Sequence, residues 1–258
     1  MQEVGNIVPI VRNGFTNIYG KHFANIREIA FRGNNINKLS IGNYILMSHS
    51  EQSDDEFASS DNTDSVYIYQ NEINPCIGYR IYSKFKNYLF NGHQDDRMIS
   101  SLQDCQKNVF LSQFPTGVVT FNGRIIGQEI PYFPESQQLD KYLANASMAQ
   151  VFKKYKELLL IVKELYDNGV IYLDIHPGNF LVTKNDKIEI IDFDKSYVLF
   201  NDRKRKYKTM ILNLYVLFND LFVEKYHIFP LLSLNKMSLD FDIIMELIDN
   251  KEKLLIKK

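Results

Sequence analysis

Cysteines, long apolar runs and net charge are all scarce in this sequence, and each shortage excludes a class of protein. Only two cysteines occur, Cys76 and Cys105, and neither stands in a Cys-x-x-Cys pair. A disulfide framework or a cysteine zinc site is therefore not expected, and we expect a reduced, cytoplasmic protein. The longest apolar runs, such as residues 158–162, are far shorter than the roughly 18 residues that a membrane-spanning helix needs.

The charges nearly cancel, because 30 Lys and Arg residues face 31 Asp and Glu residues, which leaves a net charge of −1. Such a balance disfavours overall attraction to nucleic acid or to a membrane surface. Residues 1–10 lack both the basic start and the apolar core of a secretory signal. The remaining composition, 45% hydrophobic and 24% charged in 258 residues, is that of a globular protein with one large domain or two small ones.

The first half of the chain is predicted to form mainly strands with one helix. β-Branched and aromatic residues favour strands at 65–70, 76–82, 117–121 and 124–130, and Asn122-Gly123 is a strong hairpin signal between the last two. Apolar residues at helical spacing predict a helix over 94–106.

The second half is predicted to be mainly helical. Apolar residues recur at helical spacing from about 147 to 167, and Asn168-Gly169 ends that pattern. Short strands are predicted at 170–173, 180–183 and 187–191, followed by helices at about 206–223 and 238–256. The two halves together predict an α+β fold.

Three polar side chains at strand and loop ends form the candidate site. Asp174 and Asn179 share one loop, in the segment YLDIHPGNF (172–180), and Asp192 follows the next hairpin in IIDFD (190–194). A hairpin brings Asp192 back beside the loop, and Mg²⁺ prefers a few oxygen ligands together with substrate phosphates. Asn179 and Asp192 suit that role, which leaves Asp174 to orient a hydroxyl and accept its proton. Turn and capping roles are the alternative for all three residues.

These motifs resemble the protein-kinase-like superfamily. Its H-R-D-x-x-x-x-N catalytic loop and D-F-G metal motif are matched by Y-L-D-I-H-P-G-N and D-F-D at the family's spacing. The resemblance covers roughly residues 40–258, and the wording is similar to aminoglycoside and choline kinases and to atypical bacterial kinases. It implies a two-lobed fold, with a small β-rich N-lobe carrying one main helix and a reduced, mainly helical C-lobe. The expected divisions are an extension at 1–38, an N-lobe at 39–130 and a C-lobe at 131–258.

The resemblance also implies roles for single residues. Arg80 stands where the family has a phosphate-binding Lys, although an exposed strand Arg is the alternative. Its helix partner would be Asp95 or Asp96, and either could instead be ordinary helix N-terminal charge. His176 takes the place of the family's loop Lys, to contact the transferred phosphoryl group or to hydrogen-bond the loop. Adenine would meet backbone groups of the expected hinge and inter-lobe cleft, at Glu129, Ile130 and Tyr132.

Several features depart from the family. The expected phosphate-covering loop at 59–64 has no glycine and carries two carboxylates, and Asp194 replaces the last Gly of the metal motif. Tyr172 and Leu173 replace the family's His and Arg. The segment after Asp194 is short, and the basic run Arg203–Lys208 follows it, either as a solvated helix start or as a site for an anionic acceptor.

The resemblance implies an ATP- and Mg²⁺-dependent phosphotransferase that acts on a hydroxyl. A protein Ser/Thr acceptor is favoured over a small-molecule acceptor, because the chain lacks the long insertions of aminoglycoside kinases. A pseudokinase that serves as a binding module is the second class of function, favoured by the acidic loop and Arg80. Transfer of another nucleotide-derived group, such as AMP, is a third.

Overall fold

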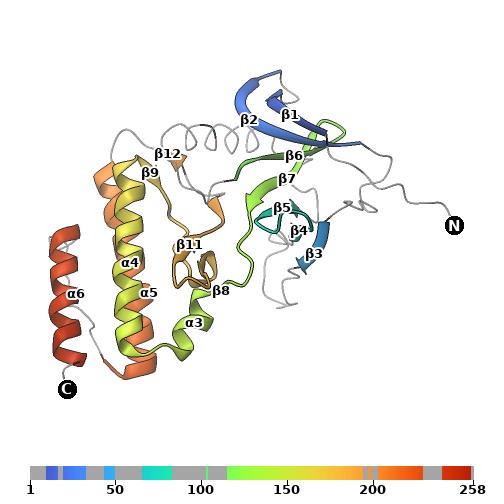
Figure 1. Ribbon diagram of the computed structural model, residues 1–258. Helices are drawn as coiled ribbons and strands as arrows, with labels where there is room; N and C mark the ends of the chain where they lie inside the picture. Colours follow the sequence, from blue (N-terminus) through green and yellow to red (C-terminus); the bar gives the residue numbers. More distant parts are fainter. Residues whose placement is uncertain are drawn as a thin grey trace, which may run out of the picture. The chain divides into compact units, whose positions relative to one another are not determined.

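The computed structural model describes residues 10–16, 20–32, 44–49, 66–82, 103, 115–193, 197–198, 203–228 and 240–256. The chain divides into two compact units, the first formed by residues 1–106 and 111–134 and the second by residues 107–110 and 135–258. Each unit is described by itself below. Figure 1 shows strands in the first unit and mainly helices in the second.

The first unit contains a seven-stranded sheet with the strand order β1-β2-β6-β7-β5-β4-β3. Its neighbouring strands are antiparallel except for β2 and β6, which run parallel. The strands are β1 (Ile10–Thr16), β2 (His22–Phe31), β3 (Tyr44–His49), β4 (Val66–Asn71), β5 (Ile77–Tyr82), β6 (Gly117–Phe121) and β7 (Arg124–Pro131). Two of them, β1 and β2, come from the segment expected to be an extension, so its described residues enlarge the sheet. The sequence predicted no such role for them.

The alternation of side chains along each strand explains why this sheet has two separate apolar clusters. Successive side chains of a strand point to opposite faces, and the neighbours Val118 and Val119 belong to two different apolar clusters. The hairpin between β6 and β7 turns at Asn122 and Gly123, which both have positive φ, at 50° and 80°. That is the backbone that an Asn-Gly hairpin turn requires, so this prediction is confirmed.

The second unit contains the helix α4 (Met148–Asp167), which has apolar residues at helical spacing and contacts both α5 and α6. Ser147 begins the helix with a capping box, because its hydroxyl accepts from the Gln150 amide while the Gln150 side chain accepts from the Ser147 amide. Gly169, at a φ of 79°, follows its end. The other elements are β8 (Gln137–Gln138), α3 (Leu139–Asn145), β9 (Val170–Ile171), the 3₁₀ turn η2 (Pro177–Asn179), β10 (Phe180–Val182), β11 (Ile188–Ile190), β12 (Tyr197–Val198), α5 (Arg203–Tyr226) and α6 (Phe241–Ile256).

Aromatic stacking joins α4 to α5. The rings of Tyr155 and Phe218 are stacked with centroids 4.3 Å apart, and those of Phe152 and Phe222 lie 4.9 Å apart. All four side chains are fully buried, so this contact is part of the apolar core of the second unit. Lys156 of α4 also pairs with Asp249 and Glu252 of α6. No helix in the described part of the chain has the length and apolarity to span a membrane.

The predicted α+β class is confirmed, and the sheet and helices are consistent with a kinase-like fold. Most of the predicted strands and helices fall within a few residues of the observed ones. The predicted helix at 94–106 lies outside the described residues, apart from the helical Gln103. The predicted division between the lobes is at 130/131, and the boundary between the two compact units is at 134/135.

Candidate active site

The loop from Tyr172 to Phe180 is held in shape by its own hydrogen bonds. The Asn179 side-chain amide donates to the Asp174 carbonyl at 3.0 Å, and the Asn179 backbone amide donates to the His176 carbonyl at 2.9 Å. His176 caps the turn η2, because its Nδ1 accepts from the Gly178 amide at 3.0 Å. These contacts link the Asn179 side chain to the Asp174 backbone, and they orient the Asn179 amide group.

The second strand of the hairpin attaches to the same loop. The Ile191 amide donates to the Asn179 carbonyl at 2.9 Å, and the Tyr172 hydroxyl donates to the Ile191 carbonyl at 3.0 Å. The ring of Tyr172 also packs against Phe193, with centroids 5.3 Å apart. Both backbone groups of Ile191 are therefore tied to the loop, immediately before Asp192. The structure brings Asp174, Asn179 and the Asp192 backbone to one place.

Asp192 has a left-handed backbone conformation, with a φ of 62°. A non-glycine residue adopts this conformation at a cost, and such outliers gather at functional sites. Asp192 is partly exposed, while Phe193 beside it is buried. The left-handed backbone thus occurs at an acidic residue that is partly exposed.

A buried lysine anchors the hairpin to α4. The Lys154 side chain is fully buried, and its Nζ lies 2.8 Å from Glu157 Oε2 and 3.0 Å from Asp186 Oδ1. Asp186 stands in the turn between β10 and β11, and Glu157 also accepts from the Ile188 amide at 2.6 Å. The turn between β10 and β11 is thereby fixed to the central helix through Asp186 and Ile188.

The same turn is held from its exposed side. Asp186 accepts from the Tyr142 hydroxyl at 2.9 Å and pairs with Lys153. The Lys153 hydrogen bond, assisted by Lys154 and Tyr142, lowers the pKa of Asp186 to about 2. Burial and the Asp186 carboxylate raise the pKa of Tyr142 to about 12. Asp186 therefore stays ionised and Tyr142 stays protonated throughout the physiological pH range.

The oxygen donors fit a cation that is bound chiefly by substrate phosphates and water. Within the described ranges, no three His, Cys, Asp or Glu side chains gather to form a metal cage. One carboxylate from Asp192 and one amide oxygen from Asn179 match the small protein contribution that Mg²⁺ sites use. The Asn179 amide nitrogen donates to the Asp174 carbonyl. The other polar atom of this side chain is the amide oxygen, which is the atom that would bind a cation.

A match to a known protein family covers this same region. Residues 154–224 match the model of the ABC1 atypical kinase-like domain. The chain is also 30% identical over 69 residues to two proteins of Encephalitozoon cuniculi, the probable cell division control protein 7 homologs 1 and 2. The aligned segment is 26% of this chain and 20% of each relative, so the chain matches about a fifth of the relatives' length.

The chain carries a kinase-like region. The predicted resemblance to the protein-kinase-like superfamily is thereby confirmed, because the family match contains the loop at 172–180, the hairpin and Asp192. It begins at Lys154, the buried residue that anchors the hairpin.

The residues expected to contact the nucleotide lie in the sheet of the first unit. Arg80 stands on β5, in register with Gln128 of β7, and has interactions of its own. Glu129 is buried in β7, where its carbonyl accepts from the Thr116 amide and its carboxylate accepts from the Thr116 hydroxyl at 2.7 Å. Ile130 pairs with Gly78, and the Tyr132 amide donates to the Cys76 carbonyl. Glu129 therefore already has partners within the sheet.

Other predicted residues lie outside the part of the chain that the structure describes. These are Asp95, Asp96 and Asp194, together with the acidic loop at 59–64. His176 was expected either to contact the phosphoryl group or to hydrogen-bond the loop, and its Nδ1 accepts from the Gly178 amide of η2. This hydrogen bond within the loop corresponds to one of its two predicted roles.

The basic run Arg203–Lys208 forms the first residues of α5. Lys204 and Lys208 line a cavity of about 220 Å³ together with Lys163, Asp240 and Asp242. Two carboxylates of the chain therefore share this surface with the lysines, which weakens its attraction for an anionic acceptor.

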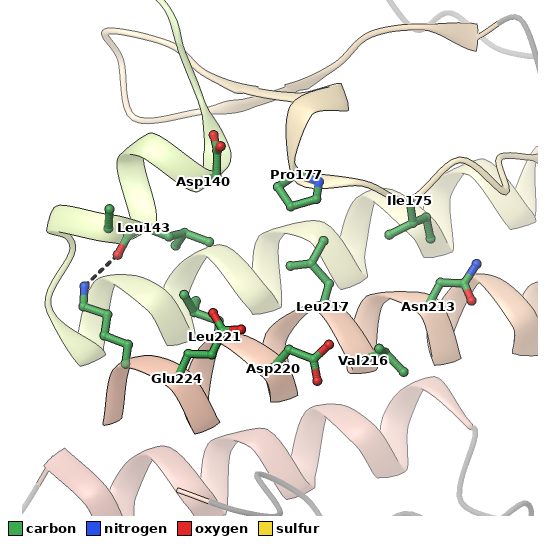
Figure 2. A pocket seen from close by; sticks show the side chains of 12 residues that line it. Asp140, Leu143, Ile175, Pro177, Asn213, Val216, Leu217, Asp220, Leu221 and Glu224 are labelled. Carbon is green, nitrogen blue, oxygen red and sulfur yellow. Dashed lines mark hydrogen bonds between the residues drawn. The ribbon is translucent and has the colours of Figure 1, made fainter. Parts of the chain in front are cut away.

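A larger cavity, of about 800 Å³, lies between α3, α5 and the loop at 172–180, the candidate catalytic loop. Figure 2 shows Ile175 and Pro177 of the loop on one side and Leu217 of α5 facing them. The loop side was visible as a motif in the sequence, but the α5 side was not predicted. Its signal is a stripe with helical spacing along one side of α5, made by Asn213, Val216, Leu217, Asp220, Leu221 and Glu224.

We predict that Tyr172→Phe loosens the kinase-like loop while keeping its packing. The ring contacts with Phe193 would remain, but the Ile191 carbonyl would lose its donor, at a cost of about 1–2 kcal/mol of unfolding free energy. Urea unfolding measures the change. Metal-dependent nucleotide binding should weaken with it, because Ile191 immediately precedes Asp192.

Tyr155→Phe is the matched control, since it makes the same chemical change at another buried tyrosine. The Tyr155 hydroxyl is buried and has no hydrogen-bond partner among the described residues. Its removal should be neutral or stabilising. Equal destabilisation by both substitutions would contradict the role given to the Tyr172 hydrogen bond.

Proposed function

We propose that the protein is an ATP- and Mg²⁺-dependent kinase that transfers a phosphoryl group to a hydroxyl. The observation that carries this proposal is the bonding of Asn179 to Asp174 and to Ile191, which gathers the acidic motif residues at one loop. The comparisons support a kinase-like phosphotransferase at the level of the family. The nucleotide, the metal and the acceptor belong to the proposal.

In the proposed reaction, the acceptor oxygen bonds to the γ-phosphorus of ATP while the bond to the β–γ bridging oxygen breaks and ADP leaves. Asp174 orients the acceptor hydroxyl and accepts its proton. Asn179 and Asp192 would hold Mg²⁺, which neutralises charge on the phosphates. His176 shapes the loop through its cap on η2, so positioning rather than covalent chemistry is the work of this chain.

The remaining nucleotide contacts are proposed from the family resemblance. Arg80 would bind the phosphates, with Asp95 or Asp96 as its partner, and backbone groups of Ile130 and Tyr132 would meet the adenine. Glu129 was expected to join them, but its carbonyl and carboxylate already bind Thr116.

A protein Ser/Thr residue is the acceptor that we favour, and a cytoplasmic location is part of this proposal. The curated relatives carry the name of a cell division control protein, but only 20% of their length is matched. A small-molecule acceptor and a pseudokinase remain the competing proposals. An anionic acceptor at Arg203–Lys208 is less favoured, since Asp240 and Asp242 line the cavity that Lys204 and Lys208 share.

Thermal melting with and without Mg-ATP tests the nucleotide site. A ligand that binds the folded state alone stabilises it by about 2.7 kcal/mol at a hundredfold excess over its Kd. We expect Mg-ATP to raise the melting temperature of the wild type, ATP with EDTA to raise it less, and Asp192→Ala to abolish the metal-dependent part.

The same experiment separates the competing functions when it is followed by transfer assays. No melting shift at millimolar Mg-ATP would contradict the kinase proposal. A shift without transfer to any protein or metabolite would favour a pseudokinase. Transfer of label from the α-phosphate, and none from the γ-phosphate, would favour nucleotidyl transfer.

A further inference from the structure

The cavity between α3, α5 and the catalytic loop adjoins the proposed base. Ile175 and Pro177, which line it, lie within three residues of Asp174 in the sequence. Asn213, which lines it from α5, donates to the Leu173 carbonyl at 3.4 Å. The cavity therefore begins at the loop that carries Asp174, on the side formed by α5 (Figure 2). A molecule bound there would lie beside the acceptor hydroxyl.

The walls of the cavity combine apolar surface with negative charge. Leu217 and Leu221 contribute apolar surface, and Val216 leaves 46% of its surface exposed. Asp220 and Glu224 stand on the same stripe of α5 and are exposed. Apolar walls next to carboxylates suit an aliphatic stem that ends in a cation.

The positive charge in this wall is already engaged. Lys225 donates to the carbonyls of Leu143 and Ala146, each at 2.6 Å, and so ties the end of α3 to α5. Asp140 of α3 adds a third carboxylate to the lining. The lining thus contains three carboxylates and one ammonium group, and that ammonium group already donates to backbone carbonyls. The excess of negative charge makes the cavity attract cations.

We propose that this cavity binds a Lys or Arg side chain of a polypeptide acceptor, next to the Ser or Thr that is phosphorylated. The proposal rests on the proposed kinase function and names the acceptor's chemistry. A guanidinium or ammonium group would pair with Asp220 or Glu224, while its methylene stem would lie on Leu217 and Leu221.

The length of the α5 stripe sets where the basic residue lies in the acceptor. A helix rises about 1.5 Å per residue, so Asp220 and Glu224 lie about 10 Å and about 16 Å along α5 from Asn213. An extended peptide advances about 3.3–3.6 Å per residue. The basic residue should therefore be about three to five positions from the phosphorylated hydroxyl.

Two assays on the full chain test the proposal. The first measures binding of fluorescent Ser peptides by anisotropy without nucleotide, comparing Arg, Gln and Glu at positions three to five on either side of the Ser. The second measures transfer from ATP labelled at the γ-phosphate to the same peptides. We expect at least tenfold tighter binding and at least tenfold higher kcat/KM for the Arg peptides, and a preference that declines with added salt.

The variant Asp220→Asn with Glu224→Gln should lose this preference, and Glu224→Lys should favour the Glu peptide. Glu246→Gln is the matched control, because it removes an exposed carboxylate from α6, away from the cavity. Melting temperatures establish that each variant is folded. The inverted preference of Glu224→Lys cannot arise from a general loss of structure.

The two assays separate failure of this inference from failure of the kinase function. Transfer or binding without an Arg preference would overturn the inference and leave the kinase function standing. An Arg preference in binding, without transfer to any peptide, would support the cavity and contradict the kinase. Binding of a free diamine in place of every peptide, lost in the double variant, would assign the cavity to a small cation and overturn the polypeptide acceptor.

Discussion

Asp174→Asn is expected to lower kcat for phosphoryl transfer about 10²- to 10⁴-fold, the usual contribution of a positioned general base. The substitution keeps the shape of the side chain but removes its ability to accept a proton. The bond that braces the loop uses the Asp174 backbone carbonyl rather than its carboxylate, so the loop should keep its form. Steady-state assays with saturating Mg-ATP measure the loss.

The comparison with Asp192→Ala makes this prediction specific. Asp174→Asn should retain the melting shift caused by Mg-ATP, whereas Asp192→Ala should lose its metal-dependent part. Full activity in Asp174→Asn would show that another group takes the proton. Loss of the melting shift in both variants would mean that Asp174 belongs to the metal site.

Lys154→Met is expected to lower the free energy of unfolding by about 3 kcal/mol, which is typical of losing one partner of a buried ion pair. Lys154 is fully buried and holds both Glu157 and Asp186. Its loss would remove the buried anchor between α4 and the β10–β11 turn, and Asn179 and Asp192 lie on either side of that hairpin. Activity should fall along with stability. Urea unfolding measures the change.

Lys153→Met is the control for this prediction. Lys153 pairs with the same Asp186, but 62% of its side chain is exposed, so its removal should cost less than about 1 kcal/mol. A similar cost for both lysines would show that burial is not what makes Lys154 important. A stable Lys154→Met protein without activity would instead assign Lys154 to the orientation of the hairpin alone.

Local patterns were sufficient for most of the elements. The Asn122-Gly123 turn, the Ser147 cap and the Gly169 stop depend on residues that contact only their near neighbours, so the sequence carries their signals directly. The strands at 10–16 and 22–31 were missed because their apolar residues give no clear alternation. Pairing of β2 with β6, almost a hundred residues away, is a tertiary contact that no local window contains.

The sequence by itself determined the motif residues Asp174, Asn179 and Asp192, because their chemistry and spacing lie within one short segment. Only the tertiary structure decided what supports them. The Tyr172 hydroxyl bonds to the Ile191 carbonyl, 19 residues later in the sequence. Lys154 of α4 pairs with Asp186, 32 residues later. The acidic cavity likewise joins α3, α5 and the loop. These contacts depend on side chains that meet through packing, and residue order alone does not encode which of them meet.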